Sequence, residues 1–337
     1  MNQLTINSPL ILHALRWSVF FSFWLAGCRA EPQRRGMPFF LDISFTLCYT
    51  YLKESKARCK MIHSDWHIHS EYSYDATLPL ERIVEKASEY GFSRIGITDH
   101  LNFNDEKFVG DLKASAAAVK ELQKKHPFVT LGVELTPIER PEFEYIAKTG
   151  TREGYIPPVC SKPYDIELAK SLEELKSLGV RYAIGAAHWR VDVPHAKGLD
   201  STIDELIREW YRQQMWLAQD ERVTILGHPW YNGKGVWYED FSVIPRSMNM
   251  DIAAALKESG KYVECNTSVM SNPKMTDKYR YQYAEFLREL FEMGIPVTHG
   301  SDSHKTYSGN HKHIEKFLTA AGFRDGDFSE LDEAHLW

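Results

Sequence analysis

The stretch that decides the fold runs from Met61 to His100 and reads MIHSDWHIHSEYSYDATLPLERIVEKASEYGFSRIGITDH. It begins with an apolar β-rich run, continues with an amphipathic segment and ends with a second β-rich run. Pro79 suits the first turn of a helix, and Gly91 suits the position just past its end. A strand, a helix and a second strand in this order predict two parallel strands joined by a helix.

The same alternation continues along the rest of the chain. Strands are expected near residues 61–67, 94–98, 128–134, 182–187, 223–227, 261–265 and 296–300. Helices are expected near residues 79–90, 111–125, 165–178, 201–219, 249–258, 277–291 and 311–320. Seven such units predict an α/β protein whose parallel sheet most easily closes into a barrel. Two long connections, at about 136–164 and 229–248, are expected to be functional loops.

The composition is that of a globular protein with an acidic body. Of the 337 residues, 43% are hydrophobic and 26% are charged, and the formal net charge is −6. Residues 1–60 hold 8 basic and 3 acidic residues, so the remaining chain carries a net charge of −11. Such a body is a poor partner for polyanions, and no nucleic-acid partner is expected. The five cysteines form no CxxC motif, which favours a reducing compartment, and a cytoplasmic location is expected.

Residues 1–60 are expected to be an N-terminal extension outside a catalytic domain of residues 61–337. The apolar run WSVFFSFWLAG at 17–27 is too short to span a bilayer, so no stable membrane span is expected. Leu25-Ala26-Gly27-Cys28 is similar to a lipoprotein cleavage box, which would make Cys28 a lipid anchor. A signal peptide would carry Lys or Arg near its start, however, and the first fifteen residues contain neither. Met61 stands where a natural start would, which allows a non-native start before it, and the favoured interpretation is that residues 1–60 have no role in the fold.

Residues that bind metals follow six of the seven expected strands. They are His67 and His69, with Asp75 in the loop beyond them, then His100, Glu134, His188, His228, Asp302 and His304. The carboxyl ends of the strands are where βα-barrels build active sites. A lone histidine is more often a core or surface residue than a ligand, but nine ligand-type residues at matching positions predict a metal site.

The size of this set predicts more than one ion. Six imidazoles and three carboxylates exceed one tetrahedral site and suit two or three divalent transition metals. Three such ions would leave the pocket with a charge of about +3, which attracts a phosphate dianion.

Read in order, the motifs HxH, SxYSxD, TDH, a single Glu, HW, GHP and GSDSH resemble the polymerase-and-histidinol-phosphatase (PHP) superfamily. The resemblance covers residues 61 to about 320. It implies a distorted (β/α)7 barrel with a trinuclear metal centre at the C-terminal ends of the strands, and phosphoester hydrolysis as the usual activity.

The resemblance also implies how the ligands are shared. His67, His69, Glu134 and Asp302 would hold one metal. Glu134 would bridge to a second metal, which is also held by His188 and His228. Asp75, His100 and His304 would hold the third. Asp75 is His in some branches, and a carboxylate there favours iron, manganese or zinc without choosing among them.

The expected reaction is the attack of a metal-bridging hydroxide on phosphorus. Asp75 or His100 could protonate the leaving alkoxide through a bound water. Arg190 is the candidate phosphate clamp, and a solvated loop arginine is an equal alternative. Lys305 and Asn266 are weaker candidates for substrate contact.

The expected substrate is a small phosphorylated metabolite, with histidinol phosphate as the best single candidate. The insert at 136–164, with its basic residues, puts that substrate in doubt. One alternative is a phosphodiesterase or exonuclease that acts on nucleotides. Another is a non-catalytic metal-binding accessory module. The sequence indicates neither the native metal nor the oligomeric state.

Overall fold

The computed structural model describes residues 61–159, 162–191, 202–231, 237, 239–307 and 311–337. The expectations for residues 1–60, including the lipid anchor at Cys28, lie outside these ranges. No helix in the described ranges has both the length and the apolar character needed to cross a membrane.

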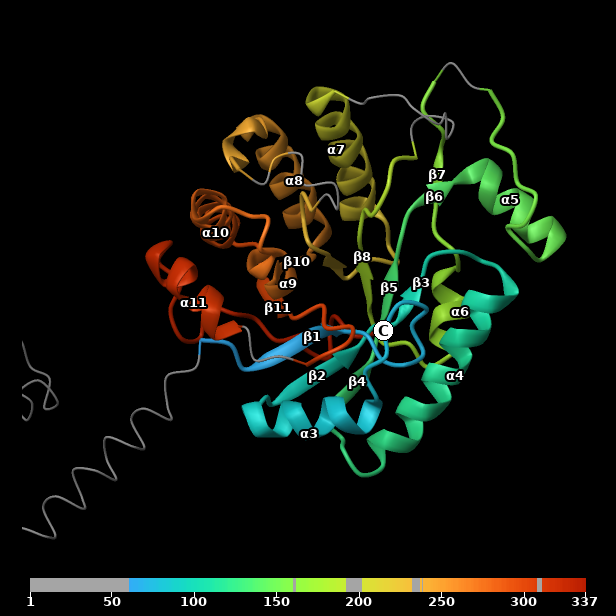
Figure 1. The fold of residues 1–337 in the computed structure, drawn as a ribbon, viewed down its shortest axis with the longest axis horizontal. Helices are drawn as coiled ribbons and strands as arrows, with labels where there is room; N and C mark the ends of the chain where they lie inside the picture. The colour runs from blue at the N-terminus through green and yellow to red at the C-terminus, as the bar shows by residue number, and fades with distance from the viewer. Residues whose placement is uncertain (1–60, 160–161, 192–201, 232–236, 238, 308–310) are drawn as a thin grey trace, which may run out of the picture. The chain divides into compact units, whose positions relative to one another are not determined.

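Parallel strands form the centre of the fold, with helices around them (Figure 1). One sheet has the order β1 (Ser64–Ile68), β2 (Arg94–Ile97) and β4 (Val129–Leu131). The other has the order β11 (Val297–Gly300), β10 (Tyr262–Asn266), β9 (Ile225–Leu226), β8 (Ala183–Gly185), β5 (Val133–Leu135) and β3 (His100–Leu101). All pairs in these two sheets are parallel, as predicted.

The two sheets join into one ring of seven segments. The chain passes directly from β2 to β3 and from β4 to β5, so these two segments belong to both sheets. On the other side, the amide of His69 donates to the carbonyl of Ser303 at 3.0 Å, and the amide of Asp302 donates to the carbonyl of His67 at 2.7 Å. An isolated parallel bridge also pairs Ile68 with Ser303. The last segment therefore meets the first, and the predicted seven-stranded barrel is confirmed.

Helices follow the strands close to the predicted positions. They are α3 (Leu80–Tyr90), α4 (Glu106–Gln123), α6 (Leu172–Ser177), α7 (Ile203–Gln219), α8 (Arg246–Ser259), α10 (Asp277–Glu292) and α11 (His311–Ala320). Gly91 ends α3 with a φ of 67°, a left-handed conformation that glycine adopts without strain. The hydroxyl of Thr202 accepts from the amide of Glu205, and the Glu205 carboxylate accepts from the amide of Thr202, so α7 begins with a capping box.

The insert after β5 differs from the prediction. Residues 136–164 are not a plain loop, because they contain β6 (Ile138–Glu139) and α5 (Arg140–Thr149). The helix expected at 165–178 is wrong in its first part: β7 (Ile166–Glu167) pairs antiparallel with β6, and α6 begins only after a capping box at Ser171. Two further short helices, η1 (Phe241–Val243) and α9 (Thr267–Ser271), were not predicted.

The amino ends of the strands enclose an apolar cluster. It consists of Trp66, Tyr182, Ile184, Ile225, Tyr262, Leu331 and Leu336. Tyr182 is fully buried and donates its hydroxyl to the carbonyl of Trp66 at 2.6 Å. A Cβ atom on Gly96 would lie 1.7 Å from the Tyr182 hydroxyl, and one on Gly132 would lie 2.5 Å from its ring. Glycine at both positions therefore makes room for this ring, which fills the barrel below the carboxyl-end site.

Candidate metal centre

The nine predicted ligand residues come together at the carboxyl ends of the strands. His67, His100 and Glu134 belong to β1, β3 and β5 themselves. The other six lie in the segments that directly follow strands β1, β8, β9 and β11: His69, Asp75, His188, His228, Asp302 and His304.

Glu134 lies at the middle of this group and is fully buried. Its Oε1 lies 3.1 Å from His228 Nε2 and 3.4 Å from His188 Nε2. Its Oε2 lies 2.8 Å from His100 Nδ1, and it also lies 3.3 and 3.4 Å from the Nε2 atoms of His69 and His67. One carboxylate thus faces five imidazoles from four different segments of the chain.

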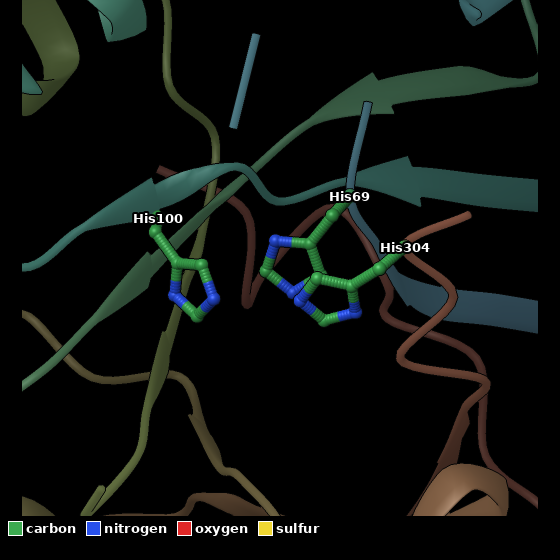
Figure 2. A group of neighbouring side chains, drawn as sticks. All are labelled: His69, His100 and His304. Carbon is green, nitrogen blue, oxygen red and sulfur yellow. The ribbon is translucent and has the colours of Figure 1, made fainter. Parts of the chain in front are cut away.

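Two smaller groups form around Asp302 and around Asp75. The first contains Asp302, His67 and His69. Asp302 Oδ1 lies 3.4 Å from His69 Nε2 and 3.7 Å from His67 Nε2, and these two nitrogens are 3.0 Å apart. Asp75 Oδ2 lies 3.5 Å from the Nε2 atoms of both His100 and His304. Figure 2 shows the rings of His69 and His304 next to each other, with His100 facing them.

The carboxylates of the group are held in their charged form. Burial alone would raise the pKa of Glu134, but the neighbouring His100 and His67 outweigh it, and the pKa lies well below its usual range. The pKa of Asp75 is also lowered, because hydrogen bonds from His100 and His304 outweigh its burial. Anionic oxygen is therefore present at the centre of the group at neutral pH.

The pKa values of two imidazoles in the group are shifted in opposite directions. Burial disfavours the charged form of His100, but Glu134 and Asp75 raise its pKa to about 10. In His188 burial wins and lowers the pKa to about 3, so this ring is neutral and ready to coordinate. His100 therefore carries a proton when no metal is bound, and a metal ion would have to displace that proton in order to bind.

The geometry and the polar atoms fit a metal site. In each of three sets of residues, the ligand atoms lie within 4.8 Å of one another. The sets are His67, His69 and Asp302; His100, Glu134 and His188; and His69, His100 and His304. Among the described residues, His100 Nδ1, His228 Nδ1 and Glu134 Oε2 are buried without a hydrogen bond of suitable geometry, although the first and the last lie 2.8 Å apart. Buried polar atoms are almost always satisfied, so orphaned imidazole and carboxylate atoms in one cluster fit coordination to an ion.

The backbone is strained at two of these residues. Asp302 and His228 have φ angles of 53° and 21°, which residues other than glycine seldom adopt. Strain of this kind costs about 1–3 kcal/mol and concentrates at functional sites. Here it aims two side chains into the centre from the ends of β9 and β11.

A buried glutamate that was not predicted supports the ligands from behind. Glu264 on β10 accepts from His67 Nδ1 at 2.7 Å and from the amide of His228 at 2.5 Å. A Cβ atom on Gly300 would lie 1.9 Å from the Glu264 carboxylate, so glycine is required there. The available signal was that Glu264 and Asn266 are two apart on one strand and so share a face.

Other side chains also orient the ligands. The Thr136 hydroxyl lies 2.9 Å from His188 Nδ1. The Asp99 carboxylate accepts from the amide of Ser70 at 2.6 Å and from the hydroxyl of Ser115 at 2.6 Å. Asp99 thereby ties the loop after β1 to α4.

The three candidates for substrate contact lie in different surroundings. Lys305 lines a cavity of about 450 Å³ together with Asp302, His304 and several hydroxyl side chains. Arg190 is half-buried, and its charge, after hydrogen bonds from Thr202, helps to lower the pKa of Glu205 at the start of α7. Asn266 is fully buried, and its amide donates to Glu264 at 3.2 Å and to Asp302 at 3.3 Å.

Comparisons with known proteins agree with the fold. A family model described as PHP domain matches residues 65–268. The crystal structure of histidinol phosphate phosphatase from Lactococcus lactis, complexed with zinc, L-histidinol and phosphate, is similar with a TM-score of 0.57 at 20% identity; the match covers 81% of this chain and 100% of that one. An endoglucanase structure matches at 12% identity over 80% of this chain and 88% of its own, with a TM-score of only 0.41. A comparison with curated protein sequences gives no significant match.

Proposed function

The chain belongs to the PHP domain family, and we propose that it is a phosphatase that uses two to three divalent metals to hydrolyse a small phosphomonoester. The observation that carries this proposal is one cluster of six imidazoles and three carboxylates, in which the buried Glu134 faces five of the imidazoles. A cluster of this kind at the carboxyl ends of barrel strands is the place where such folds perform chemistry.

We assign the ligands to three sets. His67, His69 and Asp302 form the first set and share Glu134 with the second, which is completed by His188 and His228. Asp75, His100 and His304 form the third. His100 also lies 2.8 Å from Glu134, so the second and third sets adjoin. Divalent ions bound here supply Lewis acidity that activates water and neutralises charge on phosphoryl oxygens.

The chain's own residues position these groups. Glu264 fixes the ring of His67 and Thr136 fixes that of His188, so each ring presents its Nε2 atom to the centre. Because both polar ends of Asn266 already have partners, we assign it to positioning Asp302 and the start of α9. The partly exposed Asp75 lies 3.5 Å from the buried His100, and this pair is the proposed route for the proton that the leaving alkoxide needs.

Two cations are proposed to hold the phosphoryl group. Lys305 is supported by its place in the cavity beside Asp302 and His304. Arg190 is supported by its position two residues after His188, although its charge also acts on Glu205. Steady-state kinetics of Arg190→Ala and Lys305→Ala decides between them, because the true clamp should lose about 30- to 1,000-fold in kcat/KM without loss of metal. An unchanged kcat/KM removes a residue from this role.

The experiment that tests the proposed function measures phosphate release by protein that has been stripped of metal and reloaded separately with zinc, manganese or iron. L-Histidinol phosphate is the first substrate to use, because the similar Lactococcus enzyme is complexed with L-histidinol and phosphate. p-Nitrophenyl phosphate and bis(p-nitrophenyl) phosphate share a leaving group and serve as the matched monoester and diester, both followed by release of p-nitrophenol. Faster cleavage of the diester would show a phosphodiesterase, and metal binding without any cleavage would show an accessory module.

A further inference from the structure

A second cavity, of about 340 Å³, adjoins the ligand cluster on the side of His100 and His188, and four of its seven lining residues are aromatic: Tyr74, Phe103, Phe108 and Trp189. Its volume is at the small end of the range for small-molecule sites. The cavity beside Lys305 is lined instead mainly by hydroxyl side chains, and its lining contains no Phe, Tyr or Trp. The two cavities therefore offer different chemistry to the parts of a substrate that lie beyond its phosphate.

The aromatic cavity lies beside the metal-ligand cluster, because two of its lining residues contact ligand imidazoles. Tyr74 directly precedes Asp75, and its ring centre lies 5.3 Å from that of His100. Trp189 directly follows His188, and the centres of their rings are 6.0 Å apart. One phosphomonoester could therefore place its phosphoryl group at the cluster and its alcohol part between these rings.

The aromatic rings form rigid walls. Phe103 and Trp189 stack with centres 5.7 Å apart and planes 12° from parallel. Phe108 meets both Phe103 and Tyr74 edge-on at 5.4 Å. Tyr74 nevertheless stays 52% exposed, which leaves it at the open side of the cavity. Faces and edges of this kind favour a flat ring over a saturated group of the same size.

The two formal charges in the lining are already engaged within the protein. Arg152 donates from Nε to the buried Glu142 at 2.5 Å, and its guanidinium lies 4.3 Å from the centre of the Phe103 ring. Asp105 accepts from the amide of Phe108 at 2.9 Å as the N-cap of α4. The lining thus offers apolar ring surface rather than an unpaired charge.

We infer that this cavity binds the alcohol part of the substrate and that this part carries a flat, uncharged aromatic ring. The inference rests on the proposed function, because it assigns the substrate class of the same site. Arg152, which the Glu142 carboxylate on α5 holds, then gives the insert after β5 its role: it closes one wall of the ring-binding cavity.

The first test compares two substrates on the metal-loaded full-length protein. Benzyl phosphate and cyclohexylmethyl phosphate release primary alcohols of similar size and intrinsic reactivity, so the ratio of their kcat/KM values reports on the flatness of the ring. We expect benzyl phosphate to be preferred by about tenfold. Equal kcat/KM values would overturn the inference and leave the proposed phosphatase intact.

Variants of the lining residues test whether the aromatic cavity causes the preference for benzyl phosphate. Tyr74→Ala removes an exposed wall and should reduce the ratio by about three- to tenfold, whereas Tyr74→Phe keeps the ring and should keep the ratio. Metal content is measured in each, because Tyr74 adjoins Asp75. Ser268→Ala, an exposed change in the cavity beside Lys305, is the matched control and should leave the ratio unaltered. An unchanged ratio in Tyr74→Ala would contradict the assignment of this cavity.

Binding measurements test the ring-binding cavity independently of the proposed phosphatase activity. Benzylphosphonate and cyclohexylmethylphosphonate are not hydrolysed, and calorimetry gives their Kd values whether or not turnover occurs. Tighter binding of benzylphosphonate without cleavage of any phosphate ester would refute the phosphatase and retain the ring-binding cavity. Equal binding of the two phosphonates would refute the cavity assignment itself.

Discussion

At the amino ends of the strands the barrel is filled by Trp66, Tyr182 and other apolar side chains, whereas at the carboxyl ends it is filled by ionisable groups around Glu134. The Tyr182 hydroxyl has a carbonyl partner, and its ring packs edge-on against Trp66 at 5.6 Å. Around Glu134, by contrast, buried nitrogen and oxygen atoms face one another and several lack hydrogen bonds. The comparison indicates that the amino end supplies stability and that the carboxyl end gives some of it up for ligand-binding capacity.

The largest effect is expected at the amino end. Tyr182→Ala leaves a cavity among Trp66, Gly96 and Gly132 and should lower the free energy of unfolding by about 3–5 kcal/mol, the usual cost of removing a buried aromatic ring. Urea denaturation measures this loss. Tyr182→Phe removes only the hydroxyl and should cost about 1 kcal/mol. If the comparison holds, the folded Ala variant keeps its metal content and kcat; loss of metal in the folded protein would break it.

The opposite result is expected for Glu134→Gln at the carboxyl end. Turnover should fall by at least about 10²-fold, because the carboxylate faces five imidazoles and is the proposed shared ligand. The free energy of unfolding of the metal-free protein should change far less than in Tyr182→Ala. Kinetics, metal analysis and denaturation of the same preparation measure all three. Near-normal turnover with full metal occupancy would rule out the shared role.

Glu264 tests whether the support behind the ligands matters. Glu264→Gln leaves the side chain its size but weakens its hold on His67, so metal affinity should fall by about 10- to 100-fold. Competition with a chelator of known affinity measures the change. Asp332→Asn is a suitable control, because Asp332 is a surface carboxylate that pairs with His335. Equal affinities in both variants and the unaltered protein would show that Glu264 only fills space.

Glu139 sharpens the comparison, because it is a buried glutamate without imidazoles around it. Burial raises its pKa to about 7, although a hydrogen bond from Tyr155 opposes the shift. Since this pKa lies above the value of about 4.5 in the unfolded chain, the folded state binds the proton more tightly. The contribution of Glu139 to stability is therefore complete below pH 4.5 and is lost as the pH rises through about 7.

Glu139→Gln should remove this pH dependence. Relative to the unaltered protein, the variant should gain about 1–2 kcal/mol in free energy of unfolding between pH 4.5 and pH 8, after allowance for screening by solvent. Denaturation at both values of pH measures the difference. A constant difference between the two proteins would mean that Glu139 keeps an ordinary pKa.

The smallest effect is expected from removing residues 1–60. All nine ligand residues and all seven strand segments lie within residues 61–337, so a chain that begins at Met61 should fold and keep both its metal content and its kcat. Comparison of its unfolding midpoint and turnover with those of the full chain measures this. An insoluble or inactive product would place the domain boundary earlier than residue 61.

The sequence predicted most of the barrel and the composition of the centre, because strand ends and their ligand-type residues are local features. His67 and His69, for example, could be placed on one side of a strand by their spacing alone. The β6–β7 pair was missed because Ile138 and Glu167 meet only in the folded chain. Glu264 was missed because a single acidic residue inside an apolar strand does not reveal which imidazole it will contact.

The contact between β1 and β11 determines when the metal centre can be completed during synthesis of the chain. His299 Nδ1 lies 2.9 Å from the carbonyl of Ser64, across 235 positions of the chain, and the ligands on both sides of this contact belong to one centre. At ordinary rates of synthesis a ribosome needs on the order of ten to fifty seconds to add that many residues. For this interval His67 and His69 exist without Asp302 and His304. The metal centre is therefore completed last, and a nascent chain that captures a metal ion early must hold it with an incomplete set of ligands.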